Sequence, residues 1–134
     1  MACVMPTSAA DMIYEEEVQR DPFKLGSWLR YLSARGAAPP AQRAAIYERA
    51  LRALPGSYKL WHAYLTELAG AARPLPVTDR AHAALNAAFE HALAAGMSRM
   101  PRVWHMYDSA LLDQRLLTSA RRALDRALCV LPAT

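Results

Sequence analysis

The sequence predicts an all-α chain, an α-solenoid in which antiparallel helix pairs repeat about three times. Alanine, leucine and arginine, which are good helix formers, dominate its 134 residues, and strand signals are nearly absent. Each of the three tryptophans is followed three residues later by a tyrosine. These W-x-x-Y motifs are Trp28 with Tyr31, Trp61 with Tyr64, and Trp104 with Tyr107. Their recurrence indicates a repeated helical unit.

The first elements follow from prolines and capping residues. We expect residues 1–13 to form a flexible N-terminus, and Asp21 with Pro22 to begin the helix of Trp28 as its N-cap and first turn. Pro39 and Pro40 open the next helix. The segment "PGS" at residues 55–57 ends that helix and caps the helix of Trp61.

The later elements are marked in the same way. Residues 70–79, "GAARPLPVTD", contain two prolines and predict a loop before a helix that starts near Thr78 or Asp79. Pro101 opens the helix of Trp104. We expect the repeats to occupy about residues 14–55, 56–98 and 99–134.

A second motif follows each W-x-x-Y helix. The segments "YERALRALP" at 47–55, "FEHALAAGM" at 89–97 and "LDRALCVLP" at 124–132 align without gaps. The tryptophans lie 33 and 43 residues apart, a spacing typical of solenoids built from helix pairs. The residues assigned to this second motif are Tyr47, Glu48, Arg49, Leu51, Pro55, Phe89, Glu90, Leu93, Asp125, Arg126, Leu128 and Pro132.

The aromatic side chains have two readings. Aromatics interleaved with arginine are typical of surfaces that stack the bases of single-stranded RNA. The tryptophans and tyrosines share a helix face with leucines, however, which favours burial in the core. The recurring acids have bases beside them, as Glu48 has Arg49 and Asp125 has Arg126, and we expect them to form ion pairs rather than to act as acid-base catalysts.

Charge offers two candidate partner-binding patches. The net charge is +4, and 14 of the 16 basic residues are arginines dispersed along the chain. Arg115, Arg121 and Arg122, near Arg126, could contact RNA phosphate or an acidic protein surface, or simply keep the chain soluble. The acidic run Glu15, Glu16 and Glu17 is either a solvated helix face or a docking patch.

Several kinds of site are not indicated. The four histidines and two cysteines lack the spacing of a metal site, and no phosphate-binding glycine loop or nucleophile motif is present. No stretch reaches the roughly 18 apolar residues of a membrane-spanning helix. We therefore expect no catalytic residue, cofactor, metal, membrane contact or small-molecule substrate.

The W-x-x-Y helix and the acid-Arg-Ala-Leu helix resemble HAT (half-a-TPR) repeats. The segments "YEEEVQRDPFKLGSWLRYL", "IYERALRALPGSYKLWHAYL", "MPRVWHMY" and "ARRALDRALCVLP" are similar to the N-terminal repeats of the Syf/XPA-binding family of pre-mRNA splicing factors. The chain departs from the pattern at His91, where arginine is usual, and at Met97, where the other two units have proline. Members of that family are longer solenoids, so we expect this chain to correspond to their N-terminal part.

The resemblance implies a non-enzymatic scaffold in the nucleus, joined to other spliceosomal scaffold proteins in the NineTeen complex. An extended solenoid surface suits that role because it grows with repeat number and needs no pocket. The alternative is a repeat module that binds single-stranded RNA directly in another RNA-processing complex.

Overall fold

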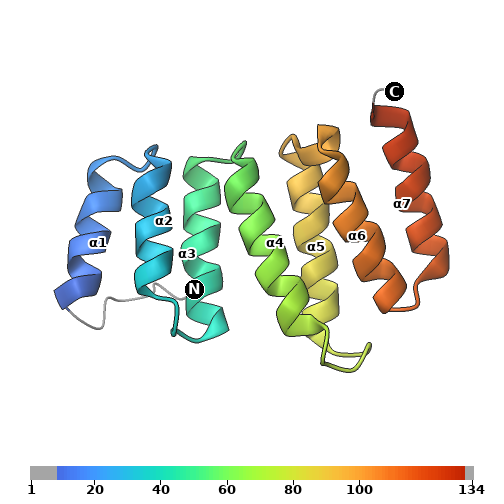
Figure 1. Ribbon diagram of the computed structural model, residues 1–134, viewed down its shortest axis with the longest axis horizontal. Coiled ribbons are helices and arrows are strands. Elements are labelled where there is room, and N and C mark those ends of the chain that lie inside the picture. The colour runs from blue at the N-terminus through green and yellow to red at the C-terminus, as the bar shows by residue number, and fades with distance from the viewer. Residues whose placement is uncertain (1–8, 132–134) are drawn as a thin grey trace. The chain divides into compact units, whose positions relative to one another are not determined.

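The computed structural model describes residues 9–131, and this part of the chain is all-helical with no strand. The elements are α1 (Ala9–Arg20), α2 (Leu25–Ala34), α3 (Pro40–Ala53), α4 (Tyr58–Ala72), α5 (Arg80–Ala94), the short 3-10 helix η1 (Met97–Arg99), α6 (Pro101–Asp113) and α7 (Leu117–Val130) (Figure 1). The predicted fold class, an all-α solenoid of helix pairs, is confirmed.

The W-x-x-Y motifs lie on α2, α4 and α6, and the acid-containing second motifs lie on α3, α5 and α7. Helix α1 precedes the first of these pairs and begins at Ala9, inside the segment that we expected to be flexible. Residues 1–8 and Pro132 lie outside the described part of the chain. The chain divides into two compact units, Met1–Leu60 and Trp61–Thr134, with the boundary inside α4.

In the first unit, α2 packs against both α1 and α3 (Figure 1). The core takes one residue or more from each helix, including Val18, Tyr31 and Ile46, all of which are almost fully buried. Each such side chain contributes about 1.5–3 kcal/mol through apolar area removed from water. The apolar faces predicted from the 3.6-residue period are therefore the faces that pack.

The turn before α2 differs from the prediction. Helix α2 begins at Leu25, so Asp21 is not its N-cap; the Asp21 carboxylate instead accepts a hydrogen bond from the backbone N–H of Phe23 at 3.2 Å. Asp21 and Pro22 form a separate turn, in which the Pro22 carbonyl accepts from the indole N–H of Trp28 at 2.8 Å. This hydrogen bond places the turn beside the Trp28 ring, before the first residue of α2.

The other predicted helix starts are confirmed. Pro40 is the first residue of α3, and Pro101 is the first residue of α6. The hydroxyl of Ser57 accepts from the backbone N–H of Leu60 at 3.3 Å at the start of α4. Asp79 is the N-cap of α5 and accepts from Ala81 at 2.9 Å, which satisfies an otherwise unpaired N–H of the first turn.

In the second unit, α6 packs against α5 on one side and α7 on the other. Helix α7 buries only short side chains, Ala120, Ala123 and Ala127, which allow its backbone to approach α6 closely. Met97, which stands where the other units have proline, is buried in η1.

Candidate functional site

The same aromatic stack appears once in each unit. In the first unit the ring of Tyr14 on α1 lies parallel to Tyr31 on α2, with centroids 5.9 Å apart. In the second unit Phe89 on α5 stacks on Tyr107 on α6 at 4.9 Å. In both cases the tyrosine of W-x-x-Y packs against the aromatic residue of the helix before it, so the motif joins one helix pair to the preceding one.

In each unit an arginine packs over the tryptophan next to the aromatic stack. Arg49 on α3 lies over the ring of Trp28 at 5.5 Å and donates to the Glu15 carboxylate on α1 at 2.6 Å. In the second unit, Arg126 lies over the Trp104 ring at 5.3 Å. It also donates two hydrogen bonds, of 2.7 and 2.9 Å, to Glu90 on α5. One arginine thus links three helices through a cation–π contact and a charge-assisted hydrogen bond.

The indole N–H groups are satisfied in the same way in both units. Trp104 donates to the Ser98 carbonyl at 2.7 Å, six residues upstream, as Trp28 donates to Pro22. The tryptophans and tyrosines of all three W-x-x-Y motifs are buried. These aromatics are core residues, and the base-stacking interpretation is wrong.

Electrostatics follow from this packing. The hydrogen bonds from Arg126 lower the pKa of Glu90, and the hydroxyl of Tyr107 donates to the same carboxylate at 2.7 Å. Burial, with the Glu90 hydrogen bond, raises the pKa of Tyr107 to about 12. In the first unit the Glu15 hydrogen bond raises the pKa of Arg49, and burial raises the pKa of Tyr31.

The acidic run at residues 15–17 is not a single docking patch. Glu15 is only 7% exposed and is held by Arg49. Glu17 pairs with Arg30 on α2, and that hydrogen bond lowers its pKa. Glu16 is exposed. Glu15 is therefore part of neither a solvated face nor a docking patch, because α1 turns it toward the helices that follow.

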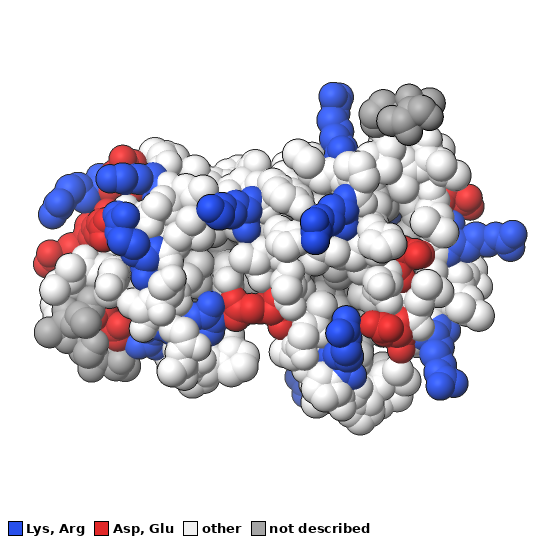
Figure 2. Space-filling view, viewed as in Figure 1, with Lys and Arg blue, Asp and Glu red and all other residues white. Residues whose placement is uncertain are grey.

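The arginine cluster is also divided. Arg126 is occupied by Glu90, whereas Arg115, Arg121 and Arg122 are exposed. Arg115, two residues after the end of α6, has a left-handed backbone with φ of 61°. On the face that Figure 2 shows, basic side chains are scattered singly or in small groups, with uncharged and acidic side chains between them.

The second-motif residues divide into a packed and an exposed set. Tyr47, Leu51, Phe89 and Leu93 are buried, whereas Glu48, Pro55, Asp125 and Leu128 are exposed. Leu128 aligns with Leu51 and Leu93, each 6% exposed, yet it is 80% exposed itself. The third copy of the motif therefore presents a side chain that the first two copies bury.

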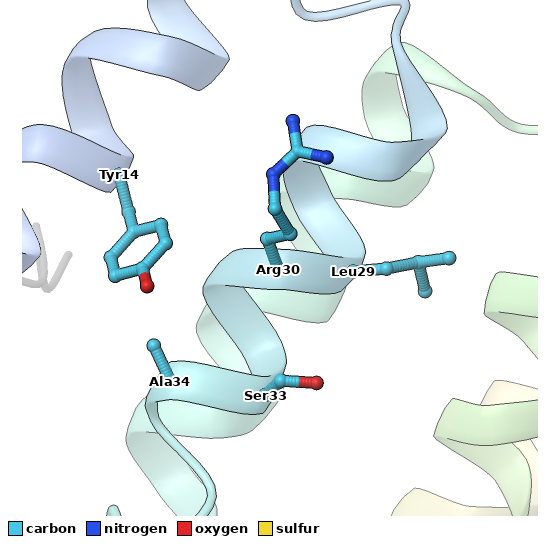
Figure 3. Close-up of a pocket in the computed structure, with 5 residues that line it drawn as sticks. All are labelled: Tyr14, Leu29, Arg30, Ser33 and Ala34. Carbon is cyan, nitrogen blue, oxygen red and sulfur yellow. The ribbon is translucent and has the colours of Figure 1, made fainter.

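Residues of α1 and α2 line an open groove, namely Tyr14 from α1 and Leu29, Arg30, Ser33 and Ala34 from α2. In Figure 3 the Tyr14 ring lies on the side of Ala34, whereas Leu29 and Ser33 point away from Tyr14. The guanidinium of Arg30 is already bound by Glu17, and the groove holds no second charged group.

Among residues 9–131 there is no group of three histidine, cysteine or acidic side chains placed to hold a metal. His82 is buried, and its Nε2 lies 3.1 Å from the carbonyl oxygen of Leu75. None of the helices within the described range is both long and apolar enough to cross a membrane.

Sequence reasoning missed the contribution of α1 to the site. The run "YEEEV" at residues 14–18 aligns with "YERAL" at 47–51, so Tyr14, Glu15 and Val18 take the places of Tyr47, Glu48 and Leu51. That similarity was available in the sequence. It was overlooked because Glu48 and Asp125 each have an arginine next to them in the sequence. In the structure those arginines bind acids on other helices, since Arg49 binds Glu15 and Arg126 binds Glu90.

The repeat pattern also appears in known proteins. The family model for the "Pre-mRNA-splicing factor Syf1/CNRKL1 N-terminal HAT repeat" matches residues 10–134. "Pre-mRNA-splicing factor SYF1" of Dictyostelium discoideum is 41% identical over 131 residues, which are 98% of this chain and 15% of that protein. The Homo sapiens protein of the same name is 43% identical over 124 residues, 92% of this chain and 14% of its own length.

A third relative, "Pre-mRNA-splicing factor syf1 homolog" of Drosophila melanogaster, is 42% identical over 124 residues. The chain spans 14–15% of the length of these relatives. The match covers α1 to α7 and every aromatic and arginine contact described above. The chain belongs to the Syf1/CNRKL1 N-terminal HAT-repeat family of pre-mRNA splicing factors.

Proposed function

We propose that this chain is a protein-protein interaction scaffold that acts in pre-mRNA splicing, in the nucleus, as a component of the NineTeen complex. The family name and the SYF1 relatives support a role in splicing. The finer assignment to that complex rests on the resemblance of the repeats. We propose further that the chain is not an enzyme and works through its surface.

One observation carries the scaffold role. The contacts that recur in both units, an aromatic stack and an arginine over a tryptophan ring, hold one helix to the next. The described surface includes exposed leucines and dispersed arginines, which can contact another protein. A solenoid of this kind offers an extended face to its partners.

The test is recovery of partners from nuclear extract. Tagged chain incubated with nuclease-treated extract is expected to retain other spliceosomal scaffold proteins, because apolar and paired-charge contacts do not require bridging RNA. Mass spectrometry of the bound fraction provides the measurement. Loss of every splicing protein after nuclease treatment would contradict the proposal.

A pair of matched variants examines the exposed arginines. Arg121→Glu with Arg122→Glu reverses two charges on α7, and Arg52→Glu with Lys59→Glu makes the same change of net charge in exposed positions of the first unit. Weaker recovery with the first variant alone would assign α7 to a partner. If both variants recover splicing proteins equally well, Arg121 and Arg122 do not contact a partner and serve only to keep the chain soluble.

A further inference from the structure

A polar contact lies one helical turn from each aromatic stack. On α1, Asp11 is three residues before Tyr14, the residue that stacks on α2. On α5, Asn86 is three residues before Phe89, the residue that stacks on α6. Residues three apart share one side of a helix, so Asp11 and Asn86 face the same W-x-x-Y helix as the aromatic ring beside them. Each of them contacts the residue that ends that helix.

The two contacts use different chemistry. In the first unit Nη1 of Arg35, the C-cap of α2, donates to Oδ2 of Asp11 at 2.7 Å. In the second unit Gln114, the C-cap of α6, exchanges two amide hydrogen bonds with Asn86, of 2.9 and 2.8 Å, and also donates to the Ala110 carbonyl at 3.1 Å. Asp11 is 5% exposed and Gln114 is 7% exposed. The first contact is therefore a largely buried ion pair, and the second is a neutral amide pair.

The packing around these contacts is nearly the same in both units. In each unit an aromatic ring stacks on the tyrosine of the W-x-x-Y helix, and an arginine lies over the tryptophan. Apolar attraction is non-directional, so it distinguishes poorly between the correct neighbour and a similar one, or between two registers one turn apart. Wrong assembly of like units is a characteristic failure of repeat proteins. A polar pair that is complete in only one arrangement disfavours the others.

We infer that the Asp11–Arg35 and Asn86–Gln114 pairs are specificity-determining contacts that fix the neighbour and the register of α2 and α6. Placed against Gln114, Asp11 would be a buried carboxylate without a counter-charge; placed against Asn86, Arg35 would be a guanidinium without one. A one-turn slip of α6 along α5 would separate the two amides and leave buried polar groups unsatisfied. Specificity of this kind holds whatever the scaffold binds, so recovery of splicing proteins from extract does not bear on it.

A role in specificity and a role in stability alone give different results. Removal of one member of a buried polar pair is costly, because the other member is left without a partner. Replacement of both members by apolar side chains of similar size is often neutral for stability, although the arrangement is then no longer specified. Asn86→Leu and Gln114→Met are close in volume to the natural side chains and can be made singly and together.

Thermal unfolding of the full 134-residue chain gives the first result. Each single variant is expected to lower the melting temperature by about 3–10 °C, and the double variant to return to within about 2 °C of the wild type. Ala87→Leu, at an exposed position next to Asn86, is the control and should change it by less than about 2 °C. A double variant that loses as much as the single variants would make the pair a source of stability only and overturn the inference.

Circular dichroism checks folding. A single variant that does not fold counts as the expected destabilisation, and the double variant then decides. A double variant that does not fold overturns the inference.

NMR spectra of the indole N–H groups give the second result, which a purely stabilising role would not change. The chain has three tryptophans, and the wild type is expected to show one indole signal for each. In the double variant α6 can adopt more than one register, so the indole of Trp104, which donates to the Ser98 carbonyl, is expected to show two or more signals. Sequential assignment identifies them. Three single signals, as in the wild type, would overturn the inference even where the melting temperature recovers.

A transplanted pair tests whether the two contacts are alternatives to each other. Asn86→Asp places a carboxylate against Gln114 and is expected to lower the melting temperature by about 3–10 °C, because the charge lacks a partner. Adding Gln114→Arg recreates the pair of the first unit and is expected to restore at least about half of that loss. Ala87→Asp is the matched control for the added charge. Absence of any recovery, or an equal loss in Ala87→Asp, would overturn the inference.

Discussion

Asp108 occupies a position that leucine holds in the other two W-x-x-Y helices. The residue four places after tryptophan is Leu32 in α2 and Leu65 in α4, and both leucines are buried. In α6 it is Asp108, one of whose carboxylate oxygens is buried without a hydrogen-bond partner among the described residues. A buried acceptor left unsatisfied costs about 1–3 kcal/mol.

We therefore expect Asp108→Leu to raise the free energy of unfolding by about 1–2 kcal/mol, from the removed penalty and the added apolar burial. Urea denaturation followed by tryptophan fluorescence provides the value. Ser109→Leu, at the exposed next position, is the control and should have little effect. A destabilised Asp108→Leu protein would show that the carboxylate has a structural partner.

The Tyr107 hydroxyl should lose its proton at a higher pH than an ordinary tyrosine. Its pKa is raised to about 12 because it is buried and donates to Glu90, so the folded state favours the neutral phenol. The resulting stability is complete below the pKa of an unfolded tyrosine, about 10, and is lost as pH rises through about 12. Absorbance titration at about 295 nm should show a late component that Tyr107→Phe removes.

Glu90 gives the free energy of unfolding the opposite dependence on pH, in the acid range. Its pKa is lowered below the ordinary 4.5, chiefly by the hydrogen bonds from Arg126, so its contribution is present above that value. The contribution is lost as pH falls through the lowered pKa of the folded state. Stability of the wild type should decline more steeply with acid than that of Glu90→Gln, and parallel curves from acid denaturation would contradict the pairing.

At the scale of the helices, local sequence signals predicted where a helix begins better than which side chains contact one another. Pro40, Pro101 and Asp79 mark the beginnings of α3, α6 and α5 because proline and aspartate act within one turn of their own position. The start of α2 at Leu25 goes with a contact that no local propensity encodes, the hydrogen bond from the Trp28 indole to the Pro22 carbonyl.

The two arginine contacts should differ in strength. The side chains of Arg49 and Glu15 are 30% and 10% exposed, whereas those of Arg126 and Glu90 are 50% and 44% exposed, so water screens the second pair more. Lysine keeps the charge but loses the planar contact with tryptophan and the forked hydrogen bonds.

Arg49→Lys is accordingly expected to lower the free energy of unfolding by about 1–2 kcal/mol, and Arg126→Lys by less than about 1 kcal/mol. Thermal and urea unfolding of both variants, at low and high salt, measure the difference. Arg52→Lys is the control, since Arg52 is exposed on α3. An equal loss in both variants would mean that exposure does not govern the contact.

At the scale of the molecule, the repeat pattern predicted the fold class because every unit buries its stripe against a neighbour, and the W-x-x-Y period encodes that stripe. The candidate site was less predictable. Leu51, Leu93 and Leu128 occupy the same motif position, so the sequence alone makes them alike. Only the helices present around each one decide that Leu128 is exposed while the other two are buried.

The net charge of +4 should support only weak, general attraction to RNA. The tryptophan and tyrosine rings of the W-x-x-Y motifs are buried and cannot stack on bases, so we expect phosphate contacts to be the main source of affinity. Binding to a short single-stranded RNA is expected to fall by about tenfold to a hundredfold between roughly 50 and 200 mM salt, as released counterions require.

The charge-reversal variants described above decide how that attraction is distributed. If the arginines are dispersed, reversal of Arg121 and Arg122 should weaken RNA binding about as much as reversal of Arg52 and Lys59, because each removes two cations and adds two anions. Anisotropy at several salt concentrations provides both the affinity and its salt slope. Tight binding that persists at high salt, and that only the Arg121 and Arg122 variant abolishes, would place an RNA site on α7 and contradict a surface built for protein partners.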